Sequence, residues 1–357
     1  MAGNGPGHAG PAGLAWMALC MSLCLAAPGQ ARADQDDQLP APACPAHKAQ
    51  ADKGFVQQGF WLEPYEPTTL GATYDSDDVR FMDITLSVKY PVMPDLVCHL
   101  FSGREQLAIA FTTRFGFYWG TRESAPVVGK RFNPKILWRH TYDSDSLFKP
   151  RLSAGLLGEH AQSAPSYVEF AYAHESNGQS ITTLQQFQAA EASYQQSDGH
   201  PEFAYDYISR GWDYLGFNWK QVLPWGNSAS QTSTQLKLRY FLPHGMFQGE
   251  PEEVHDWEAD PQGKPRRAVN GVALFAKYQR HTESNRPEAY FGDLKLAAQY
   301  ETGYETMFRY GTVRIEAGIQ FKQLPITLWW QDGYASDLAL YFRKVRSWGI
   351  ELDIGSF

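Results

Sequence analysis

A histidine and a serine placed two residues apart are the first candidates for chemistry in this sequence. His174 and Ser176 lie within Tyr172–Ser180, and Asn177 and Gly178 follow the serine directly. A histidine ring nitrogen can accept the proton of a serine hydroxyl, which makes the oxygen a nucleophile toward an ester carbon. Backbone N–H groups in a turn through Gly178 can stabilise the oxyanion that this attack forms. The spacing therefore predicts a site for acyl transfer if both side chains lie on one surface.

The alternation of polar and apolar residues predicts such a surface. In the strand expected at 165–177, His174 and Ser176 continue the apolar face. The apolar residues of that face are Val168, Phe170 and Tyr172. Asp213 likewise continues the apolar face of the strand expected at 212–225. If the two strands are neighbours, the Asp213 carboxylate can accept the ring N–H of His174 and stabilise the imidazolium that forms.

Segments of this alternating kind recur from Met82 to the end of the chain, and they predict an all-β fold. We expect twelve strands, at 82–94, 105–119, 132–144, 149–160, 165–177, 212–225, 231–243, 270–281, 289–301, 305–320, 325–340 and 344–357. These segments are longer than the roughly five to six residues of a soluble strand and are long enough to cross a bilayer at a tilt. Charged residues recur on their polar faces, as in the lumen of a barrel. These features favour a twelve-stranded antiparallel transmembrane β-barrel over a soluble β-sandwich, which can share the alternation.

The segments before the barrel predict export. An apolar run over Leu14–Ala27 and an Ala31-Arg32-Ala33 cleavage pattern indicate a signal peptide at residues 1–33. Residues 34–80 are rich in Pro, Asp, Gln and Ala, and we expect a flexible N-terminal arm there. Residues 81–357 then form the barrel domain. The formal net charge of −8 disfavours nucleic acid as a partner, and no apolar run after the signal is long enough for a membrane-spanning helix.

Two motifs together resemble those of a known family. The first is His174-x-Ser176-Asn177-Gly178-x-Ser180, and the second is Ser209-Arg210-x-Trp212 followed by Asp213. In these motifs, and from about residue 82 to the end, the chain resembles outer membrane phospholipase A, a family of twelve-stranded barrels of Gram-negative bacteria. The family usually has Asn where this chain has Asp213.

The resemblance implies a role for each matched residue. Ser176 is the expected nucleophile, His174 the general base, and Asp213 the group that orients the histidine. The Gly178 N–H is the expected oxyanion donor. An Asp in place of Asn keeps the orienting role and adds electrostatic support for a protonated His174. We therefore expect a changed pH profile and the same assignment of roles.

The resemblance also implies a calcium ion and a homodimer. Calcium takes oxygen ligands, and the expected ones are the backbone carbonyl of Gln179, the hydroxyl of Ser209 and a carbonyl at Ser124 of the partner subunit. We expect dimerisation to depend on calcium and substrate, because each site borrows metal and acyl-chain contacts from the other subunit. Thr113 stands where the family has a buried interface Gln, which leaves the strength of the dimer open.

The sequence leaves two further features open. The insertion at 181–208 carries several glutamines, and we expect a solvated extracellular loop there, with a lid over the site as the alternative. Cys44 and Cys98 remain after the signal is removed. An exported chain can pair two such cysteines, but the sequence does not decide whether these two do so.

The predicted function is that of a calcium-dependent phospholipase in the Gram-negative outer membrane, with its site toward the outer leaflet. It would hydrolyse the sn-1 and sn-2 acyl esters of phospholipids and lysophospholipids, as a phospholipase A1 and A2. This expectation rests on orientation, because reactive side chains on the lipid-facing side of a barrel wall meet membrane lipid. The competing classes are a non-enzymatic barrel, such as a small porin, and a soluble periplasmic esterase. Head-group preference, acyl-chain preference and calcium affinity are not determined by the sequence.

Overall fold

The computed structural model describes residues 62–76, 79–101, 104–119, 127–142, 165–197, 199–225, 230–248, 264–281, 290–306, 309–322, 324–334 and 337–354. The predicted signal peptide, most of the predicted arm, Cys44, Ser124 and the strand expected at 149–160 lie outside these residues. The pairing of Cys44 with Cys98 therefore stays open.

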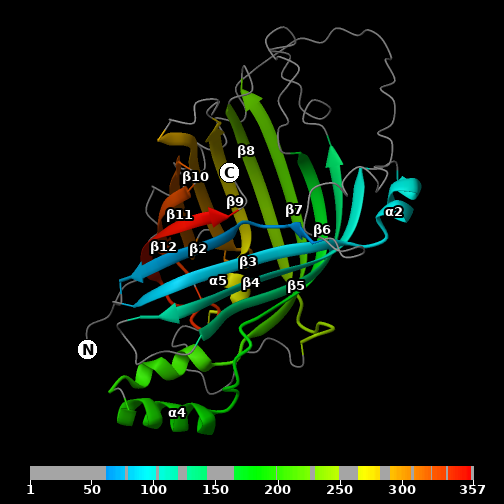
Figure 1. Ribbon diagram of the computed structural model, residues 1–357. Helices are drawn as coiled ribbons and strands as arrows, with labels where there is room; N and C mark the ends of the chain where they lie inside the picture. The colour runs from blue at the N-terminus through cyan, green and yellow to red at the C-terminus, as the bar shows by residue number, and fades with distance from the viewer. Residues whose placement is uncertain are drawn as a thin grey trace, which may run out of the picture.

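Twelve strands of the described residues form one closed antiparallel barrel (Figure 1). Neighbours in the barrel follow chain order, and β2 closes the ring by pairing with both β3 and β13. The strands are β2 (Thr68–Asp75), β3 (Arg80–Pro91), β4 (Glu105–Tyr118), β5 (Val127–Tyr142), β6 (Ser166–Ser176), β7 (Gly211–Trp225), β8 (Ser230–Phe241), β9 (Gly271–Arg280), β10 (Phe291–Gly303), β11 (Gly311–Phe321), β12 (Leu324–Gly333) and β13 (Val345–Ile354). The prediction of an all-β, twelve-stranded antiparallel barrel is confirmed.

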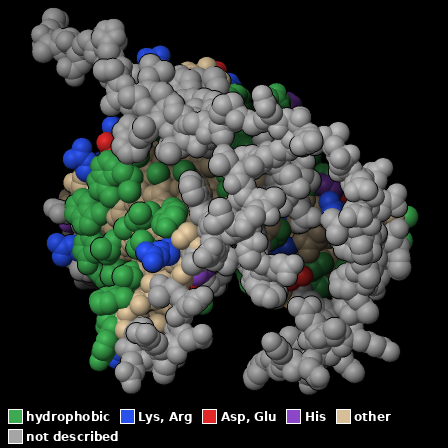
Figure 2. Space-filling model, turned by 90° about the horizontal axis from the view of Figure 1, so that it is seen from above, with side chains coloured by type: hydrophobic (Ala, Val, Ile, Leu, Met, Phe, Trp, Pro, Cys, Tyr) green, Lys and Arg blue, Asp and Glu red, His purple; other side chains and the backbone are tan. Residues whose placement is uncertain are grey.

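The barrel carries apolar residues on its outside and charged residues on its inside. Leu296, Ile315 and Leu328 lie on three successive strands and are exposed. Lys295, next to Leu296, is buried and donates to Asp353 on β13 at 3.1 Å inside the barrel. Soluble proteins bury apolar residues and expose charged ones, whereas a bilayer-crossing barrel needs the reverse. Figure 2, a view from above, shows hydrophobic side chains gathered on part of the outer surface.

The barrel begins earlier in the chain than the residue pattern predicts. The short β1 (Glu63–Pro64) and β2 both fall within residues 34–80, where a flexible arm is expected. Because β2 pairs along its length with two neighbours, that expectation is wrong for these strands. Leu70, Ala72 and Tyr74 do alternate with small or polar residues, but the Pro-rich and Asp-rich composition around them hides so short a run.

The bend between β1 and β2 enters the lumen. Tyr65 donates its hydroxyl hydrogen bond to Glu169 on β6 at 2.8 Å. Glu66 lies 3.0 Å from Lys237 Nζ on β8 and 3.7 Å from Lys135 Nζ on β5. The bend therefore links side chains of β5, β6 and β8 in one connected polar network inside the barrel.

The insertion between β6 and β7 folds into helices instead of the expected solvated loop. It contains α4 (Leu184–Ser197) and the 3₁₀ helix η1 (Pro201–Tyr207), which pack on each other. Thr183 and Gln186 cap α4 reciprocally, because each side chain accepts the other's backbone N–H, at 3.3 and 3.1 Å. Figure 1 shows α4 at the end of the barrel where β6 ends and β7 begins. No helix among the described residues is long and apolar enough to span a membrane.

Two short helices complete the described structure. Helix α2 (Pro94–Phe101) joins β3 to β4, and α5 (Arg266–Val269) directly precedes β9. Arg266 and Val269 of α5 are fully buried. Helix α5 therefore contributes to the interior of the barrel at the end that carries the candidate site.

Candidate active site

His174 and Asp213 face each other across neighbouring strands. They are register partners in the antiparallel pair of β6 and β7, so their side chains leave the sheet on the same face. His174 Nδ1 lies 2.6 Å from Asp213 Oδ1. With Nδ1 held by the carboxylate, Nε2 is the ring nitrogen left to exchange a proton with another group.

Two further donors hold the Asp213 carboxylate. Its Oδ2 accepts the Tyr172 hydroxyl at 2.5 Å and the Phe247 N–H at 2.8 Å. The Met246 N–H donates to the same Tyr172 oxygen at 2.6 Å, which leaves the hydroxyl hydrogen for the carboxylate. Asp213 has no exposed surface. The carboxylate is therefore fixed by neutral donors on one oxygen and presents the other oxygen to His174.

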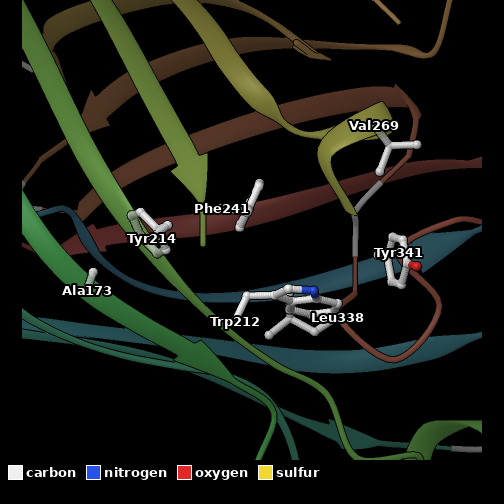
Figure 3. Packing of buried hydrophobic residues seen from close by; sticks show 7 residues of the cluster. All are labelled: Ala173, Trp212, Tyr214, Phe241, Val269, Leu338 and Tyr341. Carbon is white, nitrogen blue, oxygen red and sulfur yellow. The ribbon is translucent and has the colours of Figure 1, made fainter. Parts of the chain in front are cut away.

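The inner face of the same strands is a packed aromatic core. Ala173, Trp212 and Tyr214 are sequence neighbours of the site residues and lie in this core (Figure 3). They share it with Phe241, Val269, Leu338 and Tyr341. Close-packed interior side chains leave little room for movement. The strand segments that carry His174 and Asp213 are therefore held in place from behind.

Ser176 lies two residues after His174, at the end of β6, and is half-buried. Its register partners are Phe132 on β5 and Gly211 on β7. Within the part of the chain that the structure describes, no hydrogen bond joins Ser176 Oγ to His174. Catalytic hydrogen bonds are often long before substrate binds. The structure thus brings His174 and Asp213 into contact and leaves Ser176 beside them on the same face of the strand.

Asn177 fixes the turn at the end of β6. Its side-chain amide donates to the Ile208 carbonyl at 2.7 Å, and its Oδ1 accepts the backbone N–H of Arg210 at 2.9 Å. Gly178 then takes a φ of +64°, which glycine adopts without strain. A Cβ at this residue would lie 3.1 Å from a ring carbon of Phe132. Gly178 is exposed, so a substrate oxygen can approach its backbone.

The residues expected to bind calcium lie on two segments that run side by side. The Ser209 N–H donates to the Ile181 carbonyl at 2.9 Å, and the Ile181 N–H donates to the Tyr207 carbonyl at 3.0 Å. The Gln179 carbonyl and the Ser209 hydroxyl are oxygen donors, which suit a hard cation. Ser124 lies outside the described residues. Those residues include no group of three or more His, Cys, Asp or Glu that could hold a metal ion.

The structure adds two positioning elements that were not predicted from the sequence, Tyr172 and the segment Leu242–Gln248. Tyr172 shares the parity of His174, and that signal was available in the sequence. No sequence signal places the segment Leu242–Gln248 over Asp213, because its path depends on how the chain folds after β8. Thr113 is buried on β4, and its hydroxyl donates within the chain to a β5 carbonyl at 3.1 Å.

A closed barrel with an apolar outer wall defines an outer-membrane β-barrel protein, and three solved structures are similar to it in fold. An outer membrane phospholipase dimer from Salmonella typhi with bound calcium is similar at a TM-score of 0.51 and 17% identity, over 84% of this chain and 94% of that one. Outer membrane phospholipase A from Escherichia coli gives 0.51 and 17%, over 82% and 99%. An active-site mutant of the latter gives 0.52 and 17%, over 85% and 95%.

No family model matches the chain, and no curated protein matches it in sequence. The similarity to the three solved structures therefore concerns the fold. The chain has the fold of outer membrane phospholipase A, and this fits a protein of the Gram-negative outer membrane.

Proposed function

We propose that this protein is a calcium-dependent outer-membrane phospholipase that hydrolyses the sn-1 and sn-2 acyl esters of phospholipids and lysophospholipids. The observation that carries the proposal is the 2.6 Å contact between His174 and Asp213 on the outer, apolar side of the barrel. A reactive histidine on that side meets membrane lipid rather than a soluble substrate. The motif match and the fold shared with outer membrane phospholipase A support the same activity.

The reaction would proceed through an acyl-enzyme. His174 takes the proton of the Ser176 hydroxyl while the oxygen attacks the ester carbon, and Asp213 stabilises the imidazolium. The Gly178 N–H stabilises the oxyanion. The glycerol oxygen then leaves with the proton from His174, and the acyl group stays on Ser176. Water loses a proton to His174 and attacks the carbonyl carbon of this ester. The Ser176 oxygen then leaves with the proton from His174, which releases the fatty acid and restores the serine.

The Gln179 carbonyl, the Ser209 hydroxyl and Ser124 of the partner subunit would hold the calcium ion. When bound, the ion supplies positive charge that polarises the ester carbonyl. A site that takes one ligand from a second subunit is complete only in a dimer, and we therefore propose a homodimer that forms with calcium and substrate. The Salmonella protein, described as a dimer with bound calcium, supports both parts of this proposal.

The proposed orientation directs the site toward the outer leaflet. A signal peptide at residues 1–33 would export the chain, and the insertion that carries α4 would lie on the extracellular side, because it adjoins the site. Phospholipid that reaches the outer leaflet would then be the substrate that the site meets first.

Release of fatty acid from phospholipid in mixed micelles tests the proposal. We expect release by the wild-type protein with calcium, and loss of release with Ser176→Ala or with a calcium chelator. Ser233→Ala is a matched control, because Ser233 lies on β8 in register with Val222, away from the site. Equal release by the wild type and Ser176→Ala would contradict the mechanism. No release by the wild type would favour a non-enzymatic barrel.

A further inference from the structure

The segment after β8, Leu242–Gln248, folds back over the outer wall of the barrel. The Leu242 N–H donates to the Asp213 carbonyl at 2.9 Å, which extends the pairing of β8 with β7. Four residues later, the Met246 N–H donates to the Tyr172 hydroxyl on β6 at 2.6 Å. The segment, which we term the β8 loop, therefore crosses β7 on the side that carries the candidate site.

Contacts with Asp213 fix the position of the β8 loop. The Phe247 N–H donates to Asp213 Oδ2 at 2.8 Å, and the Gln248 side chain accepts the Asp213 N–H at 3.0 Å. At Gly245 the loop lies so close that a Cβ would be 2.0 Å from Asp213 Oδ2. A loop with main-chain and side-chain bonds to one carboxylate residue, and with no room for a side chain at its centre, is preorganised. The side chains that it projects therefore have a fixed place beside the site.

The two side chains at the tip of the β8 loop are large, apolar and exposed. Met246 is 78% exposed and Phe247 is 59% exposed. The centroid of the Phe247 ring lies 6.2 Å from that of His174 and 6.2 Å from that of Tyr172. Exposed apolar groups that gather beside a reactive residue mark a surface for an apolar ligand.

The apolar surface continues from the loop along the outer wall. Phe170, which is 51% exposed, lies two residues before Tyr172 on the same face of β6. Its ring packs on Phe217 and Trp138, with centroids 5.2 and 5.9 Å apart. Four strand residues span about 13 Å, so an apolar strip of about this length leads from the histidine along the barrel wall. A hydrocarbon chain can lie along such a strip, whereas a polar ligand would lose its hydration there.

We propose that Met246 and Phe247 bind a fatty acyl chain of the phospholipid substrate, so that each subunit supplies an acyl-binding surface beside its own His174. This inference rests on the proposed phospholipase function. It differs from an acyl contact borrowed across the dimer, because both residues belong to the chain that carries the nucleophile. Met246 and Phe247 would thereby determine the preference for acyl-chain length.

The experiment compares dipalmitoyl and dibutyroyl phosphatidylcholine as substrates of the full-length protein in mixed micelles with calcium. The double variant Met246→Ala/Phe247→Ala removes both apolar tips and keeps the main-chain donors. We expect kcat/KM for the dipalmitoyl lipid to fall about tenfold through a raised KM. The kcat/KM for the dibutyroyl lipid should fall much less, so that the ratio of the two kcat/KM values falls. Phe247→Leu should keep most of the wild-type preference, because it retains an apolar contact.

Phe291→Ala is the matched control, because Phe291 is 62% exposed and begins β10 at the end of the barrel away from the site. Heat-modifiable gel migration checks that each variant is folded. An unchanged preference in the double variant, or an equal loss for both lipids, overturns the acyl-binding role while the wild-type activity still stands. A wild-type protein that hydrolyses neither lipid overturns the proposed function, and the acyl-binding role with it.

Discussion

Two buried carboxylates lie on paired strands and face opposite sides of the barrel wall. Glu175 belongs to the lumen side, where its carboxylate lies 2.9 Å from Arg131 and 3.2 Å from Arg266. Asp213 belongs to the lipid side, where it bonds with His174 and with neutral donors. Both carboxylates are almost without exposed surface. Burial alone therefore does not distinguish their roles.

The groups that bond to Glu175 and Asp213 distinguish the roles of these two carboxylates. A guanidinium group keeps its charge at every pH that a folded protein meets, so the pairing of Glu175 cannot change during a reaction. A histidine gains and loses a proton near neutral pH, so the charge beside Asp213 can alternate as acyl transfer requires. Of the consecutive residues His174, Glu175 and Ser176, the middle one is structural and the two that face the lipid side are the candidates for chemistry.

The largest effect is expected from removing the proton acceptor on the lipid side. His174→Ala should lower kcat for phospholipid hydrolysis by roughly 10⁴-fold or more, because His174 is the proposed acceptor of the Ser176 proton. Initial rates of fatty-acid release measure this. His281→Ala is the control, because His281 also bonds to a carboxylate, Asp293, at 2.7 Å, but lies at the other end of the barrel. A comparable loss of kcat in His174→Ala and His281→Ala would show that the loss does not arise from the candidate site.

Glu175→Gln tests the lumen side of the comparison. It would leave Arg266, which is fully buried, without its counter-charge. We expect the free energy of unfolding to fall by about 3–5 kcal/mol, with a much smaller loss of kcat than for His174→Ala. Urea unfolding in detergent or lipid measures the stability.

The exposed pair of Glu305 and Arg267 supplies the control for Glu175→Gln. Glu305→Gln should change the free energy of unfolding by less than about 1 kcal/mol, because solvent screens exposed ion pairs. If Glu175→Gln were as stable as the wild type and inactive, the assignment of a structural role to Glu175 would be wrong.

Gly245→Ala sharpens the comparison because it disturbs only the β8 loop, which lies over Asp213. The added Cβ would meet the carboxylate, so the β8 loop must shift and its bond to Oδ2 must lengthen. We expect kcat to fall about ten- to hundredfold with the barrel intact, because misplacing an orienting group weakens catalysis steeply. Gly216→Ala on β7 is the control, because its nearest contact would be an ordinary 3.5 Å. Full activity of Gly245→Ala would show that the loop does not position Asp213.

The smallest effect is expected from Glu66, in the bend between β1 and β2 and outside the strands that cross the membrane. Burial opposes its ionisation, but Lys135 and Lys237 outweigh burial and hold the pKa of Glu66 well below its usual range. A carboxyl with a lowered folded-state pKa stabilises the fold above its unfolded pKa of about 4.3, and this stability is lost as pH falls through the folded-state value. The free energy of unfolding should therefore decrease as the pH falls below about 4. In Glu66→Gln it should decrease less over the same pH range. Urea unfolding at neutral and acid pH compares the two proteins. An equal decrease in the free energy of unfolding in both would contradict the stabilising role of Glu66.

Much of the barrel followed from the sequence, and the exceptions have physical reasons. Long segments of alternating polar and apolar residues predict strands well, because the alternation repeats over many residues. The eight-residue β2 was not predicted, because its alternation is short and the residues around it are rich in Pro and Asp. The helix α4 was missed although Thr183-x-x-Gln186 is a capping box, because its glutamine-rich sequence has a weak apolar face.

The sequence by itself determined which side chains share a face, because the period of two is a local property of an extended chain. Parity alone put His174, Ser176 and Asp213 on the lipid side. Only the tertiary structure decided that Asp213 is the register partner of His174, and that the β8 loop closes over its carboxylate. Register and loop path depend on bonds between residues far apart in the chain, and no short segment contains both partners of such a bond.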